Sequence, residues 1–109
     1  MQQQENTKGY IYNVTIKVDA SIAAAWFQWL VQQHIPDMMA TKCFENYRVV
    51  KLLEMEDAEG PTYAIQYQLA SRADYNRYVE LHASALQTRS FERWGDRFIA
   101  FRTLMEIVH

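Results

Sequence analysis

The chain has 109 residues, of which 50% are hydrophobic, and this suits one domain with a single core. Eleven Lys and Arg residues stand against thirteen Asp and Glu residues, so the net charge is -2 and no strong positive field favours nucleic acid. The start lacks the features of a signal peptide, and the longest apolar run, residues 22–27, is too short for a membrane span. The single cysteine forms no intrachain disulfide. We expect a cytoplasmic protein that binds neither nucleic acid nor membrane.

The first predicted element is a strand over residues 10–18, YIYNVTIKV, where apolar and polar side chains alternate. The polar residues 1–9 predict a disordered or extended tail, so the domain spans residues 10–109. Asp19 can accept hydrogen bonds from the free amides of a following helix, and apolar residues then recur at helical spacing. A helix is therefore expected to begin just after Asp19.

Pro36 interrupts this predicted helix, because proline has no N–H to donate to the carbonyl of Gln32 and disfavours the helical region for Ile35. We expect the helix to stop or kink near His34. Proline is favourable at the first position of a helix, and Asp37 beside it complements the positive end of the helix dipole. One further helical turn is therefore expected after the break.

The middle of the chain predicts a hairpin, because two apolar stretches, residues 47–55 and 62–70, flank a loop with a Gly-Pro pair. The second stretch alternates cleanly. The first has apolar residues at both parities, so its two faces cannot be assigned from the sequence.

Ser71 and Asp74 have the spacing of a capping box, and helical periodicity then continues to about Trp94. Gly95 can adopt the left-handed conformation that ends a helix. The last stretch, residues 97–108, is apolar at both parities, which predicts a strand covered on both faces.

This order of elements predicts an α+β, ferredoxin-like βαββαβ domain, a four-stranded antiparallel sheet with two helices on one face. Right-handed crossovers place the first and third strands in the centre. The helices should cover the continuous apolar face of those strands. The core is expected to contain Val14, Ile16, Trp26, Ile65, Tyr67 and Tyr78.

The other face of the sheet is then left bare. The residues expected on it are Ile11, Asn13, Thr15, Ala64, Gln66, Gln68, Phe98, Ala100, Arg102, Leu104 and Glu106. This face is either solvated or sealed against a second copy, and the homodimer is favoured because water-facing strands usually carry more Lys and Glu. The side chains expected to bond across a twofold axis at this interface are Asn13, Gln66, Gln68, Arg102 and Glu106.

Four segments, YIYNVTIKV, HIPDMMATKCF, TYAIQYQLAS and FIAFRTLMEIV, resemble a group of small bacterial proteins known only as a domain of unknown function. That group belongs to the dimeric alpha/beta-barrel superfamily, and the likeness covers nearly the whole chain after the polar start. The resemblance implies a ferredoxin-like protomer whose sheet pairs with a second copy. It implies no reaction, because the wider superfamily includes cofactor-independent monooxygenases, isomerases, haem enzymes and ligand-sensing domains.

No metal or other cofactor is expected, because the histidines and Cys43 include no pair at metal-ligand spacing. His82 lies on the inward stripe of the second helix and is expected to be a core histidine rather than a haem ligand. Cys43 is expected to be a small buried hydrophobic residue rather than a thiolate partner of His34. The arginines of the second helix alternate with acidic residues and predict a solvated surface with ion pairs.

His34 is the better candidate for a site, since it lies beside the apolar stripe where Pro36 leaves carbonyls unpaired. It either caps these carbonyls or acts as a catalytic base, and capping is favoured. The aromatic residues should meet in the layer between helices and sheet, where a pocket for a planar ligand would satisfy their polar groups. The ligand-binding candidates are Trp26, Trp29 and Tyr67.

Two functions remain open. The favoured one is a homodimeric small-molecule-binding or structural domain without a reaction. The alternative is a cofactor-independent enzyme, monooxygenase-like or isomerase-like, that acts on a small aromatic or enolisable substrate. In that enzyme His34 would take a proton and Tyr12 would donate to the developing oxyanion. A void of a few hundred Å³ beside these residues would favour a ligand site over a filled layer.

Overall fold

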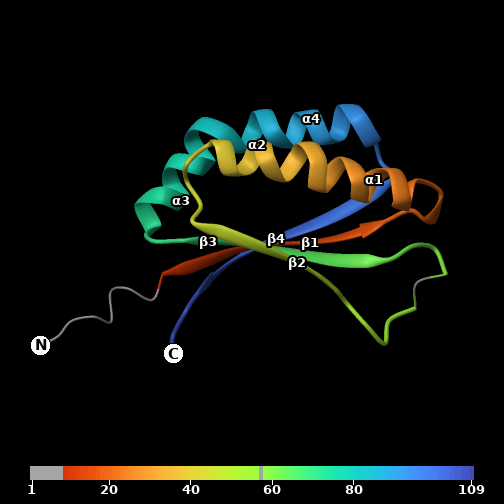
Figure 1. The fold of residues 1–109 in the computed structure, drawn as a ribbon, viewed down its shortest axis with the longest axis horizontal. Helices are drawn as coiled ribbons and strands as arrows, with labels where there is room; N and C mark the ends of the chain where they lie inside the picture. The colour runs from red at the N-terminus through yellow and green to blue at the C-terminus, as the bar shows by residue number, and fades with distance from the viewer. Residues whose placement is uncertain (1–8, 57) are drawn as a thin grey trace, which may run out of the picture.

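β1 (Tyr10–Val18) is paired on both sides in the computed structural model, which describes residues 9–56 and 58–109. The sheet has four antiparallel strands in the order β2-β3-β1-β4, and the helices cover one of its faces (Figure 1). The predicted ferredoxin-like arrangement, with the first and third strands in the centre, is confirmed. The tail predicted for residues 1–9 lies, apart from Gly9, outside the described residues.

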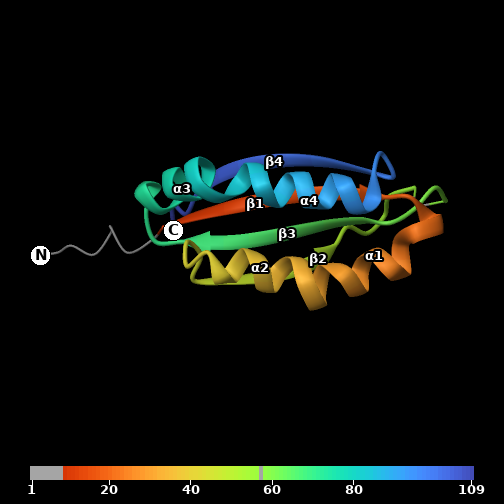
Figure 2. The same ribbon diagram turned by 90° about the horizontal axis from the view of Figure 1, so that it is seen from above.

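The other three strands are β2 (Asn46–Lys51), β3 (Thr62–Leu69) and β4 (Phe98–Glu106). The first helical segment consists of η2 (Ala20–Ile22), α1 (Ala23–Trp29), η3 (Leu30–His34) and α2 (Ile35–Ala40). The second consists of α3 (Arg72–Tyr78), η4 (Val79–Ala83) and α4 (Ser84–Trp94). Seen from above, α3 and α4 run along the β1–β4 side of the sheet, and α1 and α2 run along the β2 side (Figure 2).

The first helical segment begins where predicted, with the Asp19 carboxylate accepting a hydrogen bond from the N–H of Ser21 at 2.8 Å. It then continues through Pro36. Ile35 keeps helical angles, φ -62° and ψ -44°, and donates its N–H to the carbonyl of Leu30, which makes η3 a π-helical turn. Of the two predicted alternatives, a stop or a kink near His34, the stop is therefore wrong, and the helical segment is instead irregular there, with a π turn that ends at His34. The wider π turn relieves the clash between the proline ring and the preceding carbonyls, and the predicted turn after the proline forms as α2.

The second helical segment begins and ends as predicted. The Ser71 hydroxyl accepts a hydrogen bond from the N–H of Asp74 at 3.1 Å and lies 3.2 Å from its carboxylate. Gly95 takes φ 63° after the last residue of α4 and donates its N–H to the carbonyl of Phe91 at 2.7 Å. This segment also contains a π-helical turn, η4, which the sequence pattern does not reveal.

The two faces of the sheet follow from the strand register, because directly paired residues of antiparallel strands point to the same side. Val14 is paired with Ile65 of β3 and with Arg102 of β4, so all three face the helices. Val49 is paired with Ile65, which settles the face of β2. The side away from the helices, here called the open face, carries Ile11, Asn13, Thr15 and Lys17 from β1, Thr62, Ala64, Gln66 and Gln68 from β3, Asn46, Arg48 and Val50 from β2, and Ile99, Phe101, Thr103 and Met105 from β4.

The face assignment predicted for β4 is therefore wrong. The residues expected on the open face lie on the helix side: Phe98, Ala100, Arg102, Leu104 and Glu106. Because both parities of β4 carry apolar residues, only the register with β1 decides which set faces the helices. In the single chain β4 is also not covered on both faces, since Ile99 is 58% exposed and Phe101 is 68% exposed.

The core between the helices and the sheet contains the residues predicted for it. Val14, Ile16, Trp26, Ile65, Tyr67 and Tyr78 are all buried, at 9% exposure or less. Leu30, Met38 and Leu69 join them, so both helical segments are held to the sheet by one continuous apolar layer.

Candidate ligand cavity

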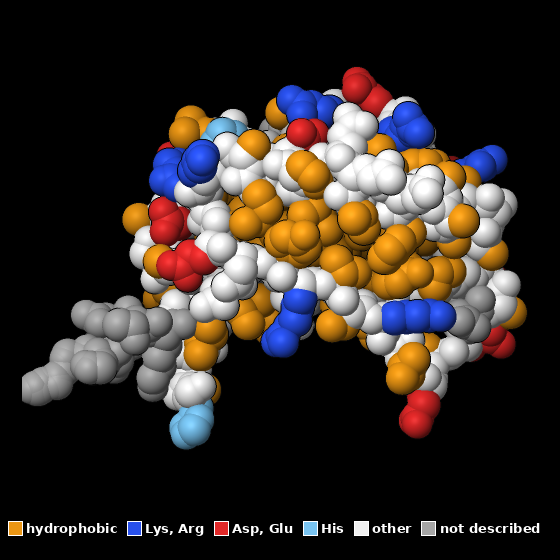
Figure 3. Space-filling view, in the orientation of Figure 1, with side chains coloured by type: hydrophobic (Ala, Val, Ile, Leu, Met, Phe, Trp, Pro, Cys, Tyr) orange, Lys and Arg blue, Asp and Glu red, His pale blue; other side chains and the backbone are white. Residues whose placement is uncertain are grey.

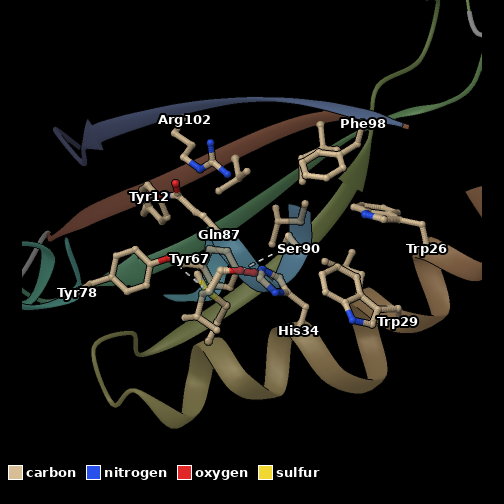
Figure 4. Close-up of a pocket in the computed structure, with 16 residues that line it drawn as sticks. Tyr12, Trp26, Trp29, His34, Tyr67, Tyr78, Gln87, Ser90, Phe98 and Arg102 are labelled. Atoms are coloured by element: carbon tan, nitrogen blue, oxygen red, sulfur yellow. Dashed lines mark hydrogen bonds between the residues drawn. The ribbon is translucent and has the colours of Figure 1, made fainter. Parts of the chain in front are cut away.

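A cavity lies in this layer between the helices and the sheet (Figure 4). The five residues predicted for catalysis or ligand binding all line it: Tyr12, Trp26, Trp29, His34 and Tyr67. The other lining residues are Val14, Ile16, Leu30, Met38, Ile65, Tyr78, Leu86, Gln87, Ser90, Phe98 and Arg102. The structure thus brings together every catalytic and ligand-binding candidate of the sequence analysis, and their chemical roles stay predictions.

The cavity is small. The space open to the centres of water molecules is about 40 Å³. One ordered water needs roughly 10–15 Å³ by this measure, so the cavity has room for a few waters. It is smaller than the few hundred Å³ that would favour a ligand site outright, yet the layer is not close-packed either. Any molecule larger than a few waters would have to widen the cavity.

Stacked aromatic rings close the cavity on the side of α1 and β2. Trp26 is 1% exposed, because Tyr63 stacks on it with ring centroids 5.7 Å apart and Phe27 packs on Tyr63 at 5.3 Å. Figure 3 shows hydrophobic side chains gathered on this face, between the helices and the sheet. On the other side, Arg102 of the edge strand β4 is exposed and Gln87 of α4 is partly buried. The mouth of the cavity therefore lies between α4 and β4.

His34, at the end of η3, separates the cavity from a surface groove between the two helical segments. Its ring stacks on Trp29 with centroids 4.8 Å apart. Neither ring nitrogen has a hydrogen-bond partner among residues 9–56 and 58–109, so the predicted capping of backbone carbonyls is not found. Burial lowers the pKa of His34 to about 4 against the opposing effect of Asp37, and Arg102 and Arg89 lower it further. The imidazole is therefore neutral at pH 7 and offers one donor and one acceptor.

Three tyrosine hydroxyls meet beside the cavity, from Tyr12, Tyr67 and Tyr78. Burial raises the pKa of each above the usual value, although Arg102 opposes this shift at Tyr12. The hydroxyls therefore stay protonated at neutral pH. Tyr78 lies 3.4 Å from the sulfur of Met38 and also within reach of the Tyr12 hydroxyl, and its one proton serves one of them at a time. The cluster thus has spare donors and acceptors for water or a ligand.

Arg102, Gln87 and Ser90 are polar lining residues that the sequence analysis does not place in the site. The side chains of Arg102 and Gln87 converge near Tyr12 (Figure 4). Ser90 is 8% exposed and donates its hydroxyl to the carbonyl of Leu86 at 3.2 Å. The sequence could have indicated Ser90, because it lies one helical turn after the apolar Leu86 and therefore on the same face of the helix. For Arg102 the register of β4 was needed.

The predicted dimer residues are divided between the two sides of the sheet. Asn13, Gln66 and Gln68 lie on the open face, whereas Arg102 and Glu106 lie on the helix side. The last two therefore cannot bond with the first three across a twofold axis through the open face. The physical reason is the register of β4, which pairs Arg102 with a core residue of β1.

The open face combines one unsatisfied polar atom with exposed apolar side chains. Asn13 donates its side-chain N–H to the Thr15 hydroxyl at 3.0 Å, but its Oδ1 is buried and has no hydrogen-bond partner in the described chain. Arg48 donates to the Gln66 side-chain oxygen at 3.1 Å. The open face thus has exposed apolar residues on β4 and one buried acceptor without a partner among the described residues.

Three further observations bear on the sequence-based predictions. Among residues 9–56 and 58–109, no group of three or more His, Cys, Asp or Glu side chains is arranged to hold a metal ion. No helix in the described part of the chain combines the length and apolarity needed to cross a membrane. Cys43 is 2% exposed, which confirms that it is a small buried residue of the core.

The strand order, the helices on one face and the cavity beneath them define a ferredoxin-like α+β protein. A crystal structure described as a dimeric ferredoxin-like protein from an uncultured marine organism superimposes with a TM-score of 0.70 over 92% of this chain and 95% of the other. The two sequences are 10% identical, so this likeness shows the fold alone. The chain belongs to the family described as domain of unknown function DUF4286, whose family model matches residues 9–108. No curated protein matches the chain. The resemblance to an uncharacterised ferredoxin-like family is thereby confirmed.

Proposed function

We propose that the protein is a homodimeric domain that binds a small molecule in the cavity between its helices and its sheet. One observation carries this proposal: polar groups with unused hydrogen-bonding capacity converge on a space whose other walls are apolar. Both ring nitrogens of His34 are without partners, and Arg102 has no acidic partner, within the described residues. Apolar walls with a few convergent polar groups are typical of small-molecule sites.

Binding is favoured over catalysis because His34 is the only candidate base and its pKa is about 4. A general base works best when its pKa lies near the working pH. At pH 7 the neutral imidazole is a good hydrogen-bond partner but a weak base. The alternative, a cofactor-independent enzyme with His34 as base and Tyr12 as oxyanion donor, requires the pKa of His34 to rise when the substrate binds.

The open face supports the homodimer. Ile99 and Phe101 are 58% and 68% exposed on β4, and Leu53 is 77% exposed after β2. The connection from β2 to β3 extends away from the sheet on the side opposite the helices (Figure 1), so Leu53 can reach a second copy there. The buried Oδ1 of Asn13 would find a donor in such a partner. The structurally similar crystal structure is itself described as dimeric.

Ligand binding is tested with a panel of small aromatic and branched aliphatic compounds in a thermal-shift assay. We expect at least one compound to raise the melting temperature of the wild-type protein, because a ligand that binds only the folded state stabilises it. Ser90→Leu should remove this response by filling the cavity. Thr88→Leu is the matched control, since Thr88 is exposed on the same helix and should leave the response unchanged.

Circular dichroism checks that both variants are folded before their responses are compared. A panel in which no compound shifts the wild-type melting temperature would contradict a binding site in this layer. So would a folded Ser90→Leu variant that responds as strongly as the wild type.

A further inference from the structure

The charge in the lining of the cavity is of one sign, positive. Arg102 is the only residue with a permanent charge among the sixteen described residues that line it, and none of them is Asp or Glu. His34 adds no charge at neutral pH, because its pKa is about 4. A ligand in the cavity therefore meets one positive charge and no negative one.

Arg102 also has no internal counterion. It forms no ion pair with any residue in the ranges 9–56 and 58–109. The nearest acidic residue on the same side of its own strand is Glu106, four residues away, or roughly 13 Å at the rise of a β-strand. Asp37, the acidic residue closest to His34, is already paired with Arg89 at 3.5 Å. Beyond its hydrogen bond with the Tyr12 hydroxyl, the guanidinium is thus left with donors to offer at the mouth of the cavity.

The charges near His34 are of both signs, but those outside the cavity are paired. Asp37 acts on His34 as a negative charge, more strongly than the positive charge of either Arg102 or Arg89, and Asp37 and Arg89 form an ion pair with each other. One side of the Arg102 guanidinium faces Tyr12 and the apolar interior, where charges interact more strongly than in water. A cationic ligand is disfavoured there, and an anionic group is attracted.

We infer that the ligand is a small organic monocarboxylate, with its carboxylate on Arg102 and its apolar body between the aromatic side chains of the cavity. This inference rests on the proposed function and names the chemical class of its ligand. A guanidinium binds a carboxylate through two parallel hydrogen bonds, and Gln87 and Tyr12 lie beside Arg102 as further donors. A phosphate monoester is less suitable, because the apolar walls would leave part of its second charge without donors.

The test compares matched acids and amides with the native protein by isothermal titration calorimetry at about pH 7. The probes are phenylacetate with phenylacetamide, and 3-methylbutanoate with 3-methylbutanamide. Each pair keeps size and shape and removes the charge. We expect each acid to bind about tenfold or more tightly than its amide, as a charge-assisted hydrogen bond predicts.

Arg102→Gln should bring the acid-to-amide affinity ratio close to one, and Arg102→Lys should keep part of it. Arg72→Gln is the control, since Arg72 is exposed at the start of α3 and does not line the cavity. The ratio isolates the charge effect, because a change of cavity shape alters the affinity of both members of a pair.

Amides that bind the wild type as tightly as the acids, or a preference that survives Arg102→Gln, would overturn the monocarboxylate assignment and leave the cavity as a binding site. The assignment also fails if these four probes do not bind while other compounds of the thermal-shift panel do. Absence of binding by every compound in both assays overturns the proposed function itself.

Discussion

His34 is a partly buried histidine whose neutral form is stabilised by the fold. Its pKa falls from 6.5 to about 4 on folding, mainly because burial disfavours the charged imidazolium. Between these two values the unfolded chain binds more protons than the folded chain. The stability that neutral His34 contributes is therefore fully present above about pH 6.5 and is lost as the pH falls toward 4. The full pKa shift of His34 corresponds to a contribution on the order of 3 kcal/mol to the free energy of unfolding.

We expect His34→Gln to reduce the loss of stability in mild acid, because Gln offers a donor and an acceptor but takes up no proton. Urea titrations at about pH 7 and about pH 4.5 measure the free energy of unfolding of both proteins. His82→Gln is the control, since His82 does not line the cavity or the groove beside His34. Equal losses of stability in the wild type and His34→Gln between the two pH values would contradict a depressed pKa.

The site could be predicted from the sequence only where local periodicity alone decides the direction of a side chain. Tyr12 and Tyr67 belong to strands that alternate cleanly, and Trp26 follows the helical stripe, so their meeting in one layer was predictable. Arg102 belongs to a strand that is apolar at both parities. Its direction depends on the partner residue in β1, which is information about the register and not about the local pattern.

At the scale of elements, the rule that proline ends a helix failed because the chain adds a π turn before Pro36. Ile35 still donates its N–H, but to the carbonyl of Leu30, five residues earlier. The proline therefore lies in the first turn of α2, where the absence of an N–H costs little. The sequence shows where the proline lies, but it does not show that the preceding turn is a π turn with one residue more than an α turn. The continuous helix and the exact position of His34 were therefore not predictable.

The end of the β2–β3 hairpin depends on a glycine at residue 60. Gly60 has φ 138°, and a Cβ there would lie 1.7 Å from the carbonyl oxygen of Val18. The neighbouring backbone is tied by a hydrogen bond from the N–H of Ala20 to the carbonyl of Glu59 at 2.9 Å. Gly60→Ala is therefore expected to destabilise the protein by several kcal/mol, because the end of β1 and the hairpin must separate.

Gly95→Ala is the matched comparison for this prediction. Gly95 also has a positive φ, 63°, but a Cβ there meets no atom within 4 Å. The free energy of unfolding of Gly95→Ala should fall only by the cost of backbone strain, about 1–3 kcal/mol. Urea denaturation of both variants gives the two free energies of unfolding. Equal losses in the two variants would show that the contact between the hairpin and the end of β1 does not limit stability.

For the whole molecule, element order and crossover handedness were enough to predict the sheet order and the side on which the helices lie. They were not enough for the composition of the open face. The sequence analysis expected Phe98, Arg102 and Leu104 on the open face, but the register of β4 places Ile99 and Phe101 there instead. The open face is therefore more apolar along β4 than expected. The apolar residues along this edge and the orphaned Asn13 oxygen near the centre of the face are the observations that support the proposed homodimer.

We expect the wild-type protein to be a dimer at micromolar concentration and Phe101→Glu to be a monomer. Phe101 is 68% exposed in the single chain, so glutamate there costs the protomer little, but twofold symmetry buries two such charges in the interface. Phe91→Glu is the matched control, because Phe91 is 62% exposed on α4, on the helix side. Arg102→Glu is a second control, because Arg102 is exposed and also lies on the helix side of the sheet. Light scattering coupled to size-exclusion chromatography gives the mass of each variant, and circular dichroism checks its fold. A monomeric wild type, or a Phe101→Glu variant that stays dimeric, would rule out pairing through the open face.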